Sequence, residues 1–460
     1  MSETPALART RPRWPARARA SAPSRARAVA AVEPGVLDRD AFAAVETGLP
    51  VWPLTVMFGL MPCWWALGIW YIVWPFFGVA LFGLLTTRGK IRVPTGGALW
   101  LIFLGIVLLS AIRLDQVTHA FVFGLRFGYL CTAFLVCVYV YNLARDQVPW
   151  SRIAHPLCLY WLSVVALGWL GVIAPKLSLP SPFLLALPDG VSGERFITDV
   201  ARLDATEFNP LSANPIYRPA APYPYTNNWG TAYSFLVPFV FACLASLRRG
   251  PMRITLIVSL PLSIVPAFLT LNRGMFIGLG AGVLYLLGRE ILRGRARLLL
   301  PVAVIVLIGW LTTLFIPVVD LITHRTSTTD SNADRFDLYR QTWAAVLHSP
   351  LLGFGQPSTV DTTHAAEPLG TQGMTWQVLY SHGIPALLCL YLLFAVIARR
   401  MAVAVTPTGL WLSSLPVIAV VVTPFYAFID PNMSVLFFAI GLGLAAVDGP
   451  VNRPAPAARQ

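Results

Sequence analysis

The chain has 460 residues, of which 56% are hydrophobic, whereas Asp, Glu, Lys and Arg together make up only 12%. This charged share is about half of that in soluble domains, so a soluble globular protein is excluded. The formal net charge is +13, but 24 of the 34 basic residues fall in the two terminal tails and in connections that are expected to face the cytoplasm. This distribution is typical of membrane proteins and does not indicate nucleic-acid binding.

Residues 1–48 form a basic segment rich in Arg, Ala and Pro. This segment has no apolar core, so it differs from a cleavable signal peptide, and we expect a disordered cytoplasmic tail. A single transmembrane domain is expected over residues 49–448, and residues 449–460 are expected to form a second cytoplasmic tail.

Apolar segments recur through the expected membrane domain, and a helix needs about 20 such residues to cross a bilayer. The segment from Leu49 to Leu85 is interpreted as a hairpin broken near Pro62, because a single crossing would put two arginine clusters on opposite faces of the membrane. The sequence therefore predicts an all-α polytopic protein in the cytoplasmic membrane, with both termini cytoplasmic and about twelve spans: 50–66, 68–86, 97–114, 117–143, 153–174, 229–247, 254–271, 275–291, 298–319, 375–397, 408–428 and 434–447.

Two predicted outer connections, residues 176–228 and 320–374, are too long to be simple turns. Loops longer than about 12 to 15 residues usually carry function, so we place the active face there. In the second connection, between Arg335 and His348, apolar residues recur three and four positions apart at Phe336, Tyr339, Trp343 and Leu347. This spacing predicts an amphipathic helix along the membrane surface before the tenth span.

Arg273 lies in a tight outer turn, Leu271-Asn-Arg-Gly274, at the start of the eighth span. Its guanidinium and the free backbone N–H groups of the helix start can converge on one anion, and a diphosphate fits such a site. The alternative is an arginine that snorkels at the membrane boundary. Arg335 and Arg340 cannot share one helix face, so at most one of them joins Arg273, and both can instead be solvated helix charges.

A polar and aromatic segment, Tyr225-Thr-Asn227-Asn228-Trp229, follows a Pro-rich stretch before the sixth span. In one interpretation the segment caps a helix and places Trp229 in the aromatic belt at the membrane interface. In the other it is a sugar platform, where aromatic faces stack on pyranose rings and the amides bind hydroxyl groups. Both interpretations stay open.

Candidate proton acceptors lie in the polar stretch before the tenth span. His364 and Glu367 can take a proton from a hydroxyl group, although such residues are also common in ordinary loops. No cofactor or metal site is predicted. The pattern Asp330-x-Asn-x-Asp334 imitates the start of a calcium loop, but the next position is Arg335 instead of the required Gly.

A few polar residues and several glycines fall within the spans. His382 is an ionisable group in the tenth span and therefore a functional candidate. His119 and Arg126 lie on one face of the fourth span, where we expect a structural bridge between helices. Close helix packing is expected at the glycines of the eighth and twelfth spans: Gly278, Gly280, Gly282, Gly441 and Gly443.

Motifs in a fixed order resemble the O-antigen ligase-like family of bacterial membrane glycan ligases and polymerases. They are Leu271-Asn-Arg273-Gly, the segment 335–343, Pro350-Leu-Leu-Gly353-Phe-Gly355, and Gly370-Thr-Gln372-Gly followed by Gly383-Ile-Pro385. The Tyr-Thr-Asn-Asn-Trp-Gly segment, and a composition with 32 arginines against two lysines, are similar to the actinobacterial branch of the family.

The resemblance implies glycosyl transfer on the outer face of the cytoplasmic membrane by an inverting enzyme that needs no metal. The donor would be a glycan on a polyprenyl diphosphate, and the acceptor another glycan (polymerase) or a different envelope molecule such as a lipid (ligase). Residue by residue, Arg273 and Arg335 match the family's diphosphate-binding arginines.

The sequence departs from the family at Gln372, where His is common, and an amide cannot act as a base. Either Gln372 orients the acceptor while His364 or Glu367 takes the proton, or the reaction depends on leaving-group stabilisation alone, or this chain is inactive or specialised. Two other functions stay open: a lipid-linked oligosaccharide flippase or transporter, and a non-catalytic subunit of a polysaccharide assembly complex. We favour the transferase because polar groups concentrate in the outer loops while ionisable residues within spans are few.

Overall fold

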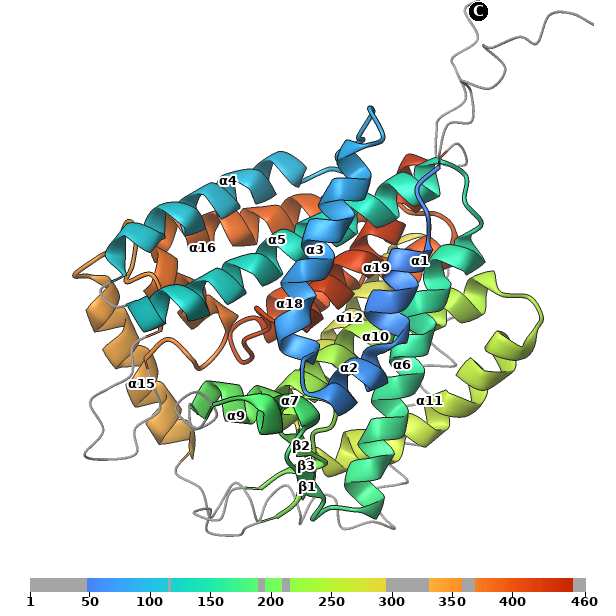
Figure 1. Ribbon diagram of the computed structural model, residues 1–460. Coiled ribbons are helices and arrows are strands. Elements are labelled where there is room, and N and C mark those ends of the chain that lie inside the picture. Colours follow the sequence, from blue (N-terminus) through green and yellow to red (C-terminus); the bar gives the residue numbers. More distant parts are fainter. Residues whose placement is uncertain are drawn as a thin grey trace, which may run out of the picture. The chain divides into compact units, whose positions relative to one another are not determined.

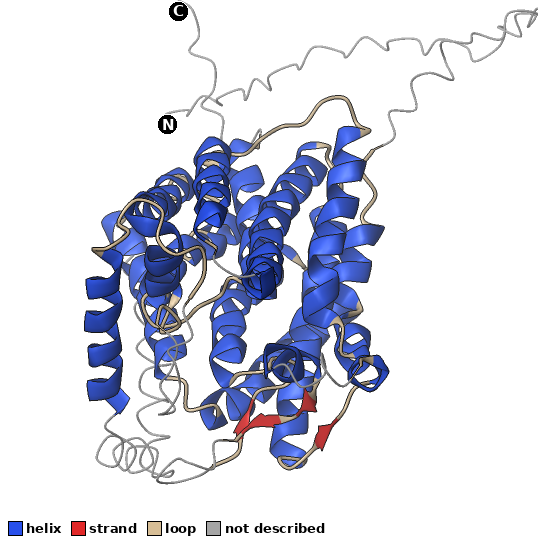
Figure 2. Cartoon of the chain, turned by 60° about the vertical axis from the view of Figure 1, so that its left-hand side comes forward, coloured by secondary structure: helices blue, strands red, loops and turns tan. Residues whose placement is uncertain are grey.

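The computed structural model describes residues 48–114, 117–188, 195–208, 216–294, 331–357 and 369–449. This part of the chain is mostly helical, as the apolar segments predicted, with only short strands at one end (Figure 2). Among the described residues, seven helices are long and apolar enough to cross a membrane: α5 (Val117–Arg145), α6 (Trp150–Ile173), α10 (Thr226–Ser246), α11 (Pro251–Leu269), α12 (Arg273–Leu292), α16 (Met374–Met401) and α19 (Pro431–Asp448).

The other predicted spans inside the described residues also have helical counterparts. Shorter apolar helices are α3 (Trp70–Thr86), α4 (Gly97–Leu109) with the 3₁₀ turn η2 (Ser110–Arg113), and the pair α17 (Pro407–Leu412) and α18 (Leu415–Val422). The first predicted span consists of α1 (Trp52–Leu54), a π-helical turn η1 (Thr55–Gly59) and α2 (Met61–Leu67). The predicted span 298–319 lies outside the described residues, so the number of crossings stays a prediction.

The first two apolar segments separate at Gly68, which corrects the predicted break near Pro62. Pro62 lies in the first turn of α2, where its missing N–H costs no helical hydrogen bond. Gly68 ends the helix in the left-handed conformation, with φ 78°, and a side chain there would lie 1.9 Å from the hydroxyl oxygen of Ser181. Only glycine satisfies both demands without strain.

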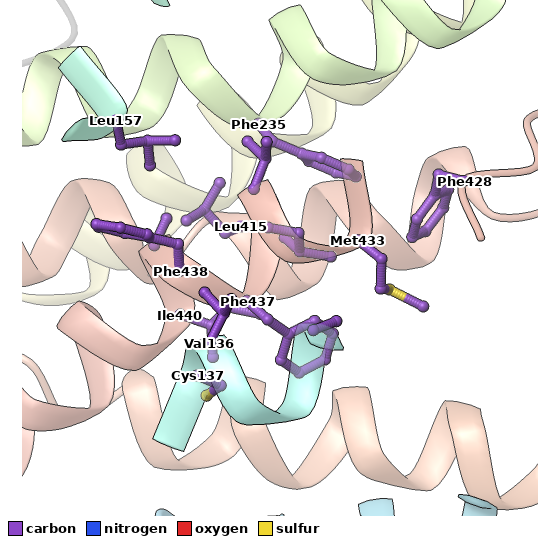
Figure 3. Packing of buried hydrophobic residues seen from close by; sticks show 14 of the residues in the cluster. Val136, Cys137, Leu157, Phe235, Leu415, Phe428, Met433, Phe437, Phe438 and Ile440 are labelled. Atoms are coloured by element: carbon purple, nitrogen blue, oxygen red, sulfur yellow. The ribbon is translucent and has the colours of Figure 1, made fainter. Parts of the chain in front are cut away.

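Helix α19 is the central helix of the bundle, and all of residues 431–445 are buried. In Figure 1 it lies among α5, α10 and α18. Its aromatic side chains pack in both directions, because the rings of Phe437 and Trp100 are 4.4 Å apart and those of Phe438 and Phe58 are 5.2 Å apart. Figure 3 shows Phe437 and Phe438 between Val136 and Cys137 of α5 on one side and Phe235 of α10 on the other.

Close approach of helices depends on glycine at several of the predicted positions. A Cβ at Gly441 would lie 2.8 Å from the carbonyl oxygen of Cys137 in α5. A Cβ at Gly278 or Gly282 would collide with side chains of α18, and one at Gly443 with Met401. Close packing is therefore confirmed at these four glycines, whereas the prediction is wrong for Gly280, which has no neighbour within 4 Å.

The described residues of the first predicted outer connection form strands and short helices. Strand β1 (Ser178–Leu179) pairs antiparallel with β2 (Leu203–Asp204), and β3 (Thr206–Glu207) pairs antiparallel with β4 (Arg218–Pro219). Two short helices, α7 (Pro182–Ala186) and α9 (Arg195–Ala201), lie beside these strands (Figure 1). In the second connection, helix α15 (Ser331–Val346) stacks Tyr339 on Trp376 of α16, with a ring distance of 4.3 Å.

The opposite end of the bundle carries most of the described arginines, and we call it the basic end. It contains the last turns of α5, α10, α16 and α19 and the first turns of α6 and α11. Arg88 pairs with Asp146, and Arg400 pairs with Asp448. This sorting of charge follows the predicted pattern, while the orientation of the basic end toward the cytoplasm stays a prediction.

The close packing at Gly441 predicts that adding a single methyl group there lowers the stability of the fold. We expect Gly441→Ala to destabilise the protein by about 1 to 3 kcal/mol, because the backbone carbonyl of Cys137 cannot rotate away from the added Cβ. The matched control is Gly280→Ala, which adds the same group in an open position of a helix. Thermal unfolding in detergent measures both, and equal melting temperatures for the two variants would contradict the packing.

Candidate active site

Helix α10 begins with the polar segment that the sequence singled out. Its first residue, Thr226, is capped by Glu207, whose Oε2 accepts a 2.7 Å hydrogen bond from the Thr226 backbone N–H. The other carboxylate oxygen of Glu207 lies 2.6 Å from Nη2 of Arg218. Because Glu207 and Arg218 belong to β3 and β4, the first outer connection is anchored to the start of α10.

The four residues predicted for sugar binding in this segment lie in different environments. Tyr225 is exposed and its hydroxyl donates to Asp199 over 2.6 Å, while Asn227 and Asn228 are half-buried. Trp229 is fully buried and stacks on Tyr233. This burial contradicts both interpretations of Trp229, since a core side chain lies neither in an interfacial belt nor on a platform open to sugars.

The Arg273 turn places an exposed guanidinium at the start of α12. Asn272 caps this helix by accepting the Met275 backbone N–H over 3.0 Å. The backbone N–H of Gly274 donates to the hydroxyl of Tyr426 over 2.9 Å. These two N–H groups were expected to be free for an anion, and the structure corrects that expectation: Arg273 itself is left as the group to bind one.

The starts of α10 and α12 adjoin each other. The side-chain amide of Asn272 donates to the Thr226 carbonyl over 3.3 Å. Gly230 allows this approach, because a Cβ there would lie 2.1 Å from Nδ2 of Asn272. The polar segment of α10 and the Arg273 turn therefore form parts of one site.

Tyr426 also holds the Gln372 motif at this site. Its carbonyl accepts the backbone N–H of Met374, the first residue of α16, over 3.0 Å. Its hydroxyl is the group that binds Gly274. Gln372 lies two residues before α16 and is buried, with 8% of its surface exposed. One tyrosine thus joins the Arg273 turn to the motif that contains Gln372.

The glycine-rich motif after α15 docks onto α16. The backbone N–H groups of Phe354 and Gly355 donate to the carbonyls of Tyr380 and Ser381 over 3.0 and 2.7 Å. A Cβ on Gly353 would lie 2.3 Å from the Tyr380 carbonyl oxygen, so the contact requires glycine. The motifs that resemble one family therefore also pack together in space.

Asp430 is a buried carboxyl group at this end that the sequence analysis missed. It caps α19 by accepting the Asn432 backbone N–H over 2.8 Å, and the side-chain amide of Asn228 donates to its other oxygen. Asn432 in turn donates to the carbonyl of Asn228 over 3.1 Å. The sequence signal for this site is Asp followed by Pro, a helix-start pattern between the last two predicted spans.

Burial raises the pKa of Asp430 from 3.8 to about 7, and hydrogen bonds from Asn432 and Asn228 oppose this shift only in part. Tyr71, Tyr129 and Tyr160 interact electrostatically with this carboxyl group. Asp430 is therefore a group that changes charge near neutral pH beside a residue predicted to bind sugar.

Helix α15 differs from the predicted amphipathic helix in the face that it buries. Thr342 and Val346 are buried, and Tyr339 packs on Trp376. In contrast, Phe336 and Trp343 are 63% and 49% exposed. The predicted apolar stripe thus faces away from the bundle, apart from Tyr339, and is free to contact the membrane.

The structure describes only some of the other residues that were predicted to take part in the site. Arg340 is exposed on α15. Arg335 lies in the same helix, but its side chain is outside the described structure, as are His364 and Glu367 altogether. The meeting of Arg273 with Arg335 therefore stays a prediction. Within the described residues, no group of three or more His, Cys, Asp or Glu side chains can hold a metal ion.

The fold and the site define a polytopic helical membrane protein with a polar site at one end. The O-antigen ligase family model matches residues 257–391, which include Arg273, Arg335 and Gln372. The match supports an O-antigen ligase-like family, and the resemblance drawn from the motifs is confirmed. It also supports a general role as a membrane polysaccharide ligase or polymerase. No curated protein matches the chain.

The raised pKa of Asp430 predicts a pH-dependent stability. Between pH 4 and pH 7 the folded protein keeps a proton that the unfolded chain loses, so the stability from this group is lost as pH rises through that window. Asp430→Asn removes the titration. We expect its melting temperature to rise relative to that of the wild type from pH 5 to pH 8, and a difference that is constant with pH would contradict the assignment.

Proposed function

We propose that the protein transfers a glycan from a polyprenyl diphosphate to an acceptor on the outer face of the cytoplasmic membrane. The observation that carries this proposal is a pair of hydrogen bonds that Tyr426 accepts from the backbone N–H groups of Gly274 and Met374. They join the Arg273 turn to the Gln372 motif. Both segments lie within the family match. The choice between ligase and polymerase depends on the acceptor.

The proposed chemistry uses Arg273 on the leaving group. In the transfer, the acceptor oxygen forms a bond to the anomeric carbon while the bond from that carbon to the diphosphate breaks, which inverts the anomeric centre. Negative charge grows on the diphosphate as this bond breaks, and a positioned guanidinium stabilises it without a divalent ion. Arg335 is proposed as the second such group on the basis of the family resemblance.

The glycan is proposed to lie along the start of α10. Tyr225 and Asn227 offer an exposed ring and an amide, and Asn228 is held by Asp430 and Asn432. Asp430 is a positioning residue in this scheme, because the residue is only 6% exposed. Arg340 is proposed to contact more distant parts of the lipid-linked glycan.

A flippase or transporter requires a path for its substrate among the spans. The ionisable residues Arg126 and His382 line a small cavity between α4, α5 and α16, where Nδ1 of His382 lies 2.7 Å from the Ser110 hydroxyl oxygen. This cavity has room for about one water molecule. Within the described residues it offers no passage for an oligosaccharide, which favours chemistry at the end of the bundle.

Removal of the arginines tests the proposal. Arg273→Ala and Arg335→Ala are each expected to lower the rate of glycan transfer by about 10²- to 10³-fold, as the loss of one positioned donor to a developing anion does. The control is Arg202→Ala, which removes an exposed arginine of the first outer connection. Transfer is measured with a lipid-linked oligosaccharide and protein purified in a folded state. Wild-type rates in both site variants would defeat the proposal.

The pH dependence of the transfer rate distinguishes a residue that takes the acceptor's proton from one that only orients the acceptor. If His364 or Glu367 is the base, alanine at that position removes the rise of rate with pH, whereas Gln372→Ala weakens acceptor binding and leaves the pH profile unchanged. The measurement is the rate of transfer against pH at saturating donor. An unchanged profile in both His364→Ala and Glu367→Ala would assign the reaction to leaving-group stabilisation alone.

A further inference from the structure

A hollow of about 410 Å³ opens at the basic end of the bundle, opposite the candidate active site. It lies between the starts of α1 and α6 and the connection from α10 to α11. Apolar walls are formed by Val51, Leu247 and Met252. Arg152 and His155 supply charge and polarity to the same hollow. We call it the basic pocket.

The walls of the basic pocket are fixed by contacts outside it. The Pro50 carbonyl, next to Val51, accepts a 2.6 Å hydrogen bond from the hydroxyl of Tyr139 in α5. Trp150 of α6 stacks on Phe239 of α10, with ring centroids 6.4 Å apart. Arg253 donates to the Leu247 carbonyl and so ends α10 at the pocket. The hollow is therefore a fixed feature between packed helices.

Within the described residues, no ion pair is formed by the basic side chains that line the basic pocket. Arg152 and His155 lie three residues apart and so project from the same side of α6, and both are exposed. Arg248 and Arg249 follow Leu247 directly and are exposed as well. None of the residues that line the pocket is acidic, so no carboxylate of the lining neutralises the guanidinium of Arg152.

The inner part of the basic pocket is apolar. Ala154 and Cys158 line it and are buried, one and two helical turns from the polar start of α6. A ligand that suits both parts has an anionic head for Arg152 and an apolar body for the walls. Basic pockets between transmembrane helices bind the head groups of anionic lipids.

We propose that the basic pocket binds an anionic phospholipid of the leaflet that this end faces. The phosphate of the head group lies against Arg152 and His155, and the first part of the acyl chains lies against Val51, Leu247 and Met252. A lipid bound there ties α1 and α6 to the connection between α10 and α11. This site is separate from the glycan-transfer site and does not depend on the proposed function.

Thermal unfolding of the full chain in a neutral detergent tests the site. We expect phosphatidylglycerol to raise the melting temperature more than phosphatidylcholine does at equal concentration. In Arg152→Ala the phosphatidylglycerol concentration needed for half of this shift should rise about fivefold, as expected for one basic residue near an anionic lipid. Arg152→Lys should keep most of the shift. The matched control is Arg399→Ala, which removes an exposed arginine of the same end that does not line the pocket.

Three results would overturn the lipid site. Equal shifts with phosphatidylglycerol and phosphatidylcholine would show that lipid charge is not recognised. An effect of Arg399→Ala as large as that of Arg152→Ala would show only general attraction to a basic surface. A shift of the same size with soluble glycerol 1-phosphate would identify a site for free phosphate esters in place of a lipid.

Discussion

Tyr426 is the residue on which the arrangement of the candidate site depends. Its hydroxyl accepts the Gly274 N–H and its carbonyl accepts the Met374 N–H, so it fixes the first turns of α12 and α16 in one position. Gly274 and Met374 are buried, so neither N–H group can donate to water. Leaving one of these groups without an acceptor would lower the stability of the fold by about 1 to 3 kcal/mol. The need to pair these groups, more than any attraction between charges, brings the Arg273 turn to the Gln372 motif.

The two ends of the bundle pair different polar groups: backbone N–H groups at one end and arginine side chains at the other. At the site end, Glu207, Asn272 and Asp430 cap the helix starts, and the guanidinium of Arg273 is exposed. At the other end, arginines pair with Asp146 and Asp448. The apolar α19 runs between these ends. A carrier diphosphate and an anionic lipid head group are thus proposed for opposite ends of the bundle.

The helices could be predicted from the sequence because hydropathy acts over neighbouring residues, and each described span coincides with a helical segment. The site could be predicted only in part. Arg273 and the α10 segment stand out as polar residues at helix boundaries, but their partners lie far away in the chain: Asn228 bonds to Asp430, and Gly274 to Tyr426. No local pattern shows which N–H groups such partners occupy, so the free helix start expected at α12 was wrong. The burial of Trp229 was missed for the same reason.

The most direct test of the central claim is the chemical analysis of what the purified protein makes from a polyprenyl-diphosphate-linked glycan and an acceptor, with EDTA present. The proposed function predicts a new glycosidic bond of inverted configuration, together with free polyprenyl diphosphate in equal amount. Recovery of the donor with its glycan still attached, whether or not it has crossed the bilayer, would contradict transfer and leave a transporter or an assembly subunit as the explanation.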